Sequence, residues 1–79
     1  MQVKVFYHDK CEPSNLLFNK VKKESNVELI HIEGDPYQVR DHEIQAVPTT
    51  LILDSNRKEI KRLVGYSSDI IKIIKEYNH

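Results

Sequence analysis

The stretch that decides the fold lies near the start of the chain, at residues 3–14, and reads VKVFYHDKCEPS. Apolar side chains alternate through this stretch as far as Tyr7, which is the period-two pattern of a strand. A helical pattern begins directly after Cys11, and Pro13 is tolerated there because the first turn of a helix does not use its missing N–H. We therefore predict a strand, a short turn and a helix, with the cysteine at the helix N-terminus.

The segments that follow predict an α/β fold with the element order βαβαββα. Strands are expected at residues 2–7, 27–32, 49–54 and 59–64, and helices at residues 12–24, 36–44 and from 67 or 68 to 77. The first strand–helix–strand unit should be parallel, whereas the short polar turn before the last strand requires an antiparallel hairpin. The expected architecture is a four-stranded mixed sheet flanked by helices, in a single domain over residues 1–79.

Length and composition narrow the classes of function. The 79 residues leave room for one modest core, and 12 basic residues balance 12 acidic ones. Without a net positive field, nucleic acid and anionic membranes are poor partners, so proteins or small molecules are favoured. Neither a membrane-spanning run nor a signal-peptide pattern is found, and we expect a monomeric, cytoplasmic protein.

The single cysteine is the principal candidate for chemistry. Cys11 has no second cysteine with which to form an internal bridge, so it is not a structural disulfide. The unpaired N–H groups at a helix N-terminus stabilise an anion, and Lys10 adds a positive charge that Glu12 opposes. We expect a reactive thiolate, and the alternative is a buried, inert cysteine.

Two motifs carry a resemblance to a known family. Residues 11–14, CEPS, resemble the Cys-Gly-Pro-Cys site of thioredoxins with serine in place of the second cysteine, and residues 46–49, AVPT, resemble the loop of that superfamily that contains a cis-proline. The resemblance covers nearly the whole chain and implies a thiol-disulfide oxidoreductase without a cofactor. It implies Cys11 as nucleophile and Ser14 in the position of the resolving cysteine. The residues that it implies for substrate binding are Lys10, Glu12, Pro13, Val47, Pro48 and Gly65.

Size and local motifs indicate a branch of this superfamily. The extra N-terminal strand and helix of full-length thioredoxins are missing, and residues 3–7, 35–36 and 65–70 resemble the small glutaredoxin-like redoxins that reduce ribonucleotide reductase. The resemblance implies protein disulfides, with ribonucleotide reductase among them, and an upstream thiol reductase as partners. Val5 stands where thioredoxins place a buried acid, and Lys10 stands where they place a tryptophan. The CEPS motif matches neither glutathione-using nor iron-sulfur-carrying glutaredoxins, which disfavours both activities.

Ser14 leaves the second half of the reaction open. A hydroxyl can hydrogen-bond a thiolate, but it cannot attack a mixed disulfide. The chain is therefore either a natural monothiol protein or a cysteine-to-serine replacement, and the retained Pro13 favours the replacement. Two further alternatives are a redox-inactive binding module with the same fold and a monothiol glutaredoxin-like protein.

The histidines predict no metal site. His8, His31, His42 and His79 lie in separate predicted elements, and only His8 is near Cys11 in the sequence. Those two residues would supply fewer ligands than the four that a structural zinc ion usually has.

Overall fold

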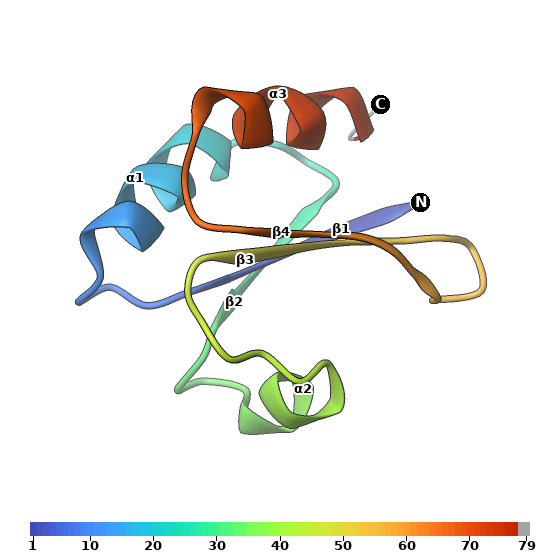
Figure 1. Ribbon diagram of the computed structural model, residues 1–79, viewed down its shortest axis with the longest axis horizontal. Coiled ribbons are helices and arrows are strands. Elements are labelled where there is room, and N and C mark those ends of the chain that lie inside the picture. The colour runs from blue at the N-terminus through green and yellow to red at the C-terminus, as the bar shows by residue number, and fades with distance from the viewer. Residues whose placement is uncertain (78–79) are drawn as a thin grey trace.

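The computed structural model describes residues 1–77 and has the predicted element order (Figure 1). The strands are β1 (Gln2–Tyr7), β2 (Val27–His31), β3 (Thr49–Leu53) and β4 (Glu59–Val64). The helices are α1 (Glu12–Val21), α2 (Pro36–Asp41) and α3 (Ser68–Tyr77). The fold class is therefore α/β, as predicted.

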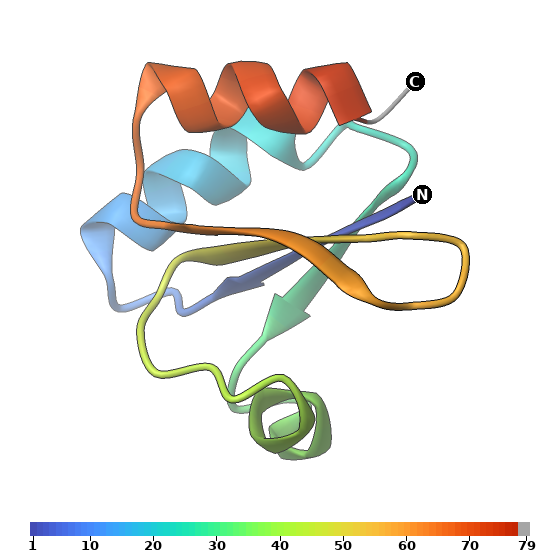
Figure 2. The ribbon, with the colours of Figure 1, turned by 45° about the vertical axis from the view of Figure 1, so that its right-hand side comes forward.

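The four strands form one mixed sheet in the order β2-β1-β3-β4. β1 and β2 are parallel, while β1 with β3 and β3 with β4 are antiparallel, which confirms the predicted pairing. Helices α1 and α3 cover one face of the sheet, and α2 lies against the other face (Figures 1 and 2). Tyr7 lies opposite His31, so the loops after β1 and β2 leave the sheet at the same end of these two parallel strands.

Several elements are shorter than predicted. The first helix ends at Val21 rather than Glu24, because the backbone N–H of Glu24 turns back to the carbonyl of Val21 at 2.9 Å. The second helix ends at Asp41 rather than Ile44, because Glu43 has a φ of 52°, outside the helical region. The second and third strands each end one residue before the predicted boundary.

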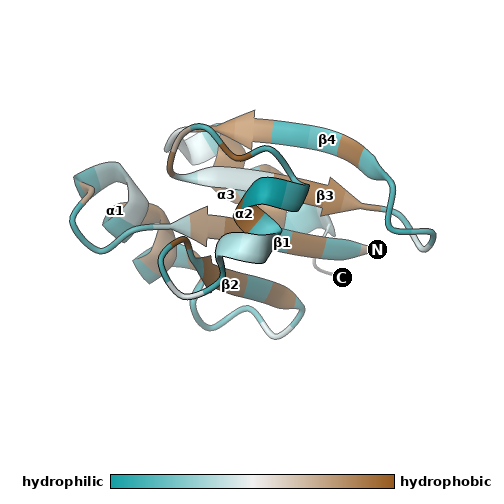
Figure 3. Ribbon diagram, turned by 90° about the horizontal axis from the view of Figure 1, so that it is seen from below, coloured by the Kyte–Doolittle hydropathy of each residue, from teal (hydrophilic) through white to brown (hydrophobic). Residues whose placement is uncertain are grey.

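Two apolar cores lie on opposite faces of the sheet. The core under α1 and α3 consists of Val3, Val5, Leu17, Val21, Ile52 and Ile74, and the core under α2 consists of Phe6, Ile30, Leu51 and Leu53. Strand alternation explains the division, since Val5 and Phe6 point to opposite faces of β1. β3 is buried along its whole length, and Figure 3 shows it as largely hydrophobic, whereas β4 has hydrophilic residues in its middle.

Side-chain caps hold the starts of the second and third helices. The carboxylate of Asp35 accepts a hydrogen bond from the backbone N–H of Gln38 at 3.2 Å, and the side-chain amide of Gln38 donates to the same carboxylate at 2.8 Å. These bonds from Gln38 lower the pKa of Asp35 below its ordinary value. At the last helix, Ser67 rather than Ser68 accepts the backbone N–H of Ile70, at 3.2 Å.

The buried isoleucine of α3 provides a test of this packing. Ile74 is fully buried between α3 and the sheet, whereas Ile60 on β4 is 46% exposed. We expect Ile74→Ala to lower the free energy of unfolding by about 2 to 5 kcal/mol through lost burial and a residual cavity. Ile60→Ala should cost at most about 1 kcal/mol. Urea unfolding of both variants gives the comparison, and equal losses would mean that α3 does not close the core.

Candidate functional site

Cys11 occupies the N-cap position of α1, in an extended conformation with φ −110° and ψ 117°. Its backbone is fixed on both sides, because its N–H donates to the carbonyl of His8 at 3.2 Å and its carbonyl accepts the N–H of Asn15 at 3.0 Å. The Cys11 side chain makes no capping bond to the helix, and the residue is half-buried. The sulfur is therefore held at the start of the helix, in a residue that is only partly covered.

The loop that contains Pro48 lies against this sulfur. Sγ of Cys11 is 3.6 Å from the carbonyl oxygen of Val47, and the Val47–Pro48 peptide bond is cis. The carbonyl of Pro48 in turn accepts the backbone N–H of Gly65 at 2.8 Å. Gly65 has a φ of 98°, which lies in the region that favours glycine. The fold thus brings together three segments that the sequence analysis had proposed as parts of one site.

The remaining predicted residues lie at different depths. Lys10, Glu12 and Pro13 are exposed beside Cys11, and Val47 is half-buried next to the buried Pro48. Together with the Pro48 loop, these exposed residues make up the rim of the candidate site, and their part in substrate binding stays a prediction.

Ser14 lies in the first turn of α1, three residues after Cys11, and its side chain is fully buried. Within residues 1–77 its Oγ has no hydrogen-bond partner, so the hydrogen bond to the Cys11 sulfur that a hydroxyl could make is not formed. Thr50 is also fully buried with an unpartnered hydroxyl in that part of the chain. Thr50 lies opposite Val5 in the register of β1 and β3, and Val5 is itself fully buried. Position 14 itself thus suits a small side chain with little hydrogen-bonding demand, such as that of cysteine, because the buried hydroxyl there finds no partner within residues 1–77.

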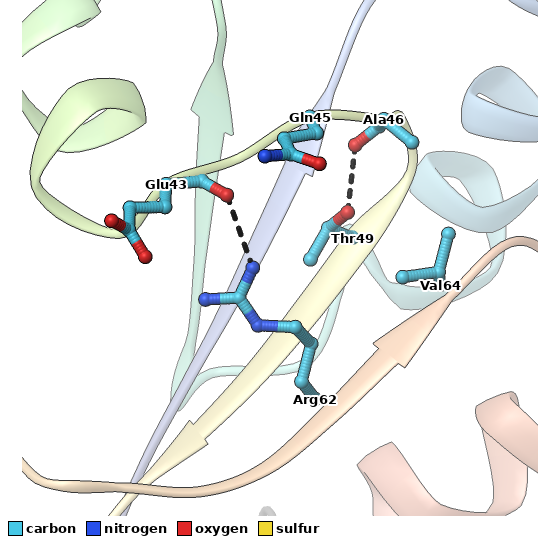
Figure 4. A pocket seen from close by; sticks show the side chains of 6 residues that line it. All are labelled: Glu43, Gln45, Ala46, Thr49, Arg62 and Val64. Atoms are coloured by element: carbon cyan, nitrogen blue, oxygen red, sulfur yellow. Dashed lines mark hydrogen bonds between the residues drawn. The ribbon is translucent and has the colours of Figure 1, made fainter.

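A hollow of about 340 Å³ lies beside the Pro48 loop (Figure 4). It is lined by Glu43, Gln45, Ala46, Thr49, Arg62 and Val64. The Thr49 hydroxyl donates to the carbonyl of Ala46 at 2.7 Å, and the Arg62 guanidinium donates to the carbonyls of Glu43 at 3.2 Å and His42 at 2.6 Å. These bonds attach the loop before Pro48 to β3 and β4.

Arg62 is a positioning residue that the sequence analysis missed. Its guanidinium also binds the carboxylate of Glu59 at 2.8 Å, and this bond lowers the pKa of Glu59. No pattern in the sequence could have indicated the contact with the loop, because the acceptors there are backbone carbonyls of residues far along the chain.

Two of the histidines that lie in separate predicted elements are neighbours in the structure. The parallel pairing of β1 and β2 brings His31 next to His8, with ring centroids 4.9 Å apart. Nε2 of His31 lies 2.8 Å from Oδ1 of Asp9, and Nε2 of His8 contacts the carboxylate of Glu33. The hydrogen bond from His31 is the main reason that the pKa of Asp9 lies below its ordinary value.

Thioredoxins are among the solved structures that have the same arrangement of elements. No protein-family model and no curated protein sequence matches the chain. Among solved structures, thioredoxin 1 from Thermosipho africanus TCF52B is 28% identical and superposes with a TM-score of 0.78, covering 98% of this chain and 93% of its own. The thioredoxin of Malassezia sympodialis is 20% identical, with a TM-score of 0.79 and coverage of 98% and 74%. That of Plasmodium falciparum is 15% identical, with a TM-score of 0.80 and coverage of 95% and 82%.

The chain belongs to the thioredoxin-like superfamily. The Thermosipho structure bears on the predicted branch, because 93% of that thioredoxin is covered by this short chain. Small size therefore does not by itself separate a glutaredoxin-like member of the superfamily from a thioredoxin. Among residues 1–77, the structure has no helix that is both long and apolar enough to span a membrane.

Two neighbouring threonines, Thr49 and Thr50, provide a test of which hydrogen bond fastens the loop that contains Pro48. Thr49 and Thr50 are both buried, but only the hydroxyl of Thr49 has a partner in the described part of the chain. We expect Thr49→Val to cost about 1 to 3 kcal/mol, because it leaves the Ala46 carbonyl without its donor.

The matched variant is Thr50→Val, which removes an unpaired hydroxyl at nearly constant shape. It should leave the free energy of unfolding unchanged or raise it. Urea unfolding of the two variants measures the difference. A larger loss for Thr50→Val than for Thr49→Val would show that the loop is not fastened by the Thr49 hydroxyl.

Proposed function

We propose that the protein carries out thiol-disulfide exchange on protein disulfides, with Cys11 as the nucleophile. The observation that supports this most directly is the position of the Cys11 sulfur, at the N-terminus of α1 and 3.6 Å from the Val47 carbonyl beside Pro48. A helix N-terminus stabilises the thiolate, which is the reacting form of cysteine. Cys11 is only half-buried, so part of the residue is accessible.

In the proposed first step, the Cys11 thiolate attacks one sulfur of a substrate disulfide. A new disulfide forms between Cys11 and the substrate, the substrate's own S–S bond breaks, and its second sulfur leaves as a thiolate. The exchange needs no cofactor, because electrons pass directly between sulfurs. An upstream thiol reductase would restore the reduced protein.

The substrate segment would lie along the rim that contains the Pro48 loop. An extended strand could pair with the backbone of Val47, since recognition by strand addition depends on main-chain hydrogen bonds. Pro48 and Gly65, whose carbonyl and N–H bond each other, would shape the surface beside it, while Lys10, Glu12 and Pro13 would contact side chains of the substrate at the rim. Substrates would then be selected mainly by local shape, with ribonucleotide reductase as one candidate within the cytoplasm.

Ser14 determines how far the reaction goes. Residues three apart on a helix share a face, so a thiol at position 14 could reach the mixed disulfide, whereas a hydroxyl does not perform this exchange. The buried, unpartnered Ser14 side chain suits the replacement of a cysteine by serine. The chain would therefore hold its substrate covalently rather than release it.

The serine variants provide the test of this function. We expect the unaltered chain to accumulate a covalent complex with an oxidised protein substrate on a non-reducing gel. Ser14→Cys should convert that complex into repeated turnover in a disulfide-reduction assay driven by an external dithiol. Ser55→Cys is the matched control, since it adds a thiol at an exposed position in the turn between β3 and β4 and should give no gain.

Two outcomes would contradict the dithiol mechanism. Turnover of the unaltered chain with glutathione, without a gain from Ser14→Cys, would indicate a monothiol glutaredoxin-like activity instead. A Cys11 that reacts no faster than an ordinary thiol with iodoacetamide, and forms no complex, would indicate a redox-inactive binding module. Cys11→Ser should abolish both the complex and the turnover.

A further inference from the structure

Four potential metal ligands lie at one end of the parallel strand pair. β1 and β2 run side by side, and the loops that follow them leave the same end of the sheet (Figure 1). The first strand end contributes His8 and Asp9, and the second contributes His31 and Glu33. Each end thus supplies one imidazole and one carboxylate, and each imidazole faces the carboxylate of the other end.

The donor atoms are close enough to share one ion. One ligand atom from each of the four residues lies within 4.8 Å of all the others. The imidazoles are the more enclosed pair, with side-chain exposures of 16% for His8 and 30% for His31, while the Asp9 and Glu33 side chains are 66% and 67% exposed. The cluster is therefore anchored at the sheet by the rings and open to solvent on the side of the carboxylates.

The chemistry of this donor set favours a particular class of ion. Two imidazole nitrogens and two carboxylate oxygens suit a divalent ion of borderline softness, such as Zn²⁺, which is usually bound by four such ligands in a tetrahedron. Mg²⁺ and Ca²⁺ prefer oxygen donors and would gain little from the rings. We propose that His8, Asp9, His31 and Glu33 form a binding site for one zinc-type divalent transition-metal ion.

The present hydrogen bonds show what binding must change. The backbone N–H of Lys10 donates to Nδ1 of His8 at 3.0 Å, and that of Glu33 donates to Nδ1 of His31 at 3.2 Å. Neutral rings that accept at Nδ1 carry their proton on Nε2, where it faces a carboxylate. A metal ion bound at Nε2 needs the lone pair of that nitrogen, which is free only when the ring proton is on Nδ1. Each ring proton must therefore move to Nδ1 through solvent, and both hydrogen bonds from the backbone N–H groups must break.

This rearrangement limits the affinity without preventing binding. The loss of each hydrogen bond should lower the metal-binding constant by about tenfold or less. Four metal ligands together can offset this loss. The loss of the hydrogen bond from Lys10 to His8 also moves the backbone of Lys10, the residue directly before Cys11. Occupation of the site would therefore alter the turn that leads into α1.

Cobalt provides a direct spectroscopic probe of the site. We expect Co²⁺ to bind one ion per chain with tetrahedral ligand-field absorption in the visible range, and Zn²⁺ to displace it. The titration is made in the unaltered chain and in Cys11→Ser, and both should bind equally and without sulfur-to-metal charge transfer. Because Cys11→Ser removes the nucleophile, the result does not depend on the proposed exchange activity.

Substitutions within and outside the cluster identify the ligands. His31→Gln and Glu33→Gln should each weaken Zn²⁺ binding by about tenfold or more. His42→Gln and Glu76→Gln are the matched controls, since neither residue belongs to the cluster, and they should leave binding unchanged. Circular dichroism shows whether each variant retains the fold. Absence of Co²⁺ binding, loss of binding in Cys11→Ser, or equal losses in the control and cluster variants would overturn the proposal.

Discussion

The rest of the structure depends on β1 being hydrogen-bonded on both sides, to β2 in parallel and to β3 in antiparallel fashion. Val5 and Phe6 are fully buried on its two faces, so a shift of one residue would move each of them to the opposite face and would turn Lys4 towards the core under α1 and α3. This constraint fixes the point at which the chain leaves the sheet. Cys11 follows four residues after the end of β1 at Tyr7. The loop that contains Pro48 and the residues His31 and Glu33 are brought to the same end of the sheet by β3 and β2.

The parts of the fold that could be predicted are those that depend on local pattern. Alternation in β1, the apolar face of α3 and the Asp35 cap all correspond to features of the sequence that act over a few residues. The helix ends at Val21 and Asp41 were less predictable, since the residues beyond them are compatible with either a helix or a turn. The proximity of His31 to His8 could not be predicted at all, because it requires the register between two strands.

The candidate site shows the same division between local and distant information. The position of Cys11 at a helix start follows from the strand, the turn and Pro13. The direction of the Ser14 side chain depends on how α1 rests on the sheet, and the contact of Arg62 with the loop before Pro48 depends on backbone carbonyls.

The conformation of Gly65 also restricts how this position can vary. A Cβ atom added there would meet no atom within 4 Å, so the space beside the residue would admit a larger side chain. The φ of 98° is nevertheless one that side chains of the L configuration rarely adopt. Tolerance at position 65 should thus follow the propensity of an amino acid for left-handed backbone conformations rather than its volume. Asparagine and aspartate would then be accommodated before alanine, and valine, although small, would be among the least acceptable residues.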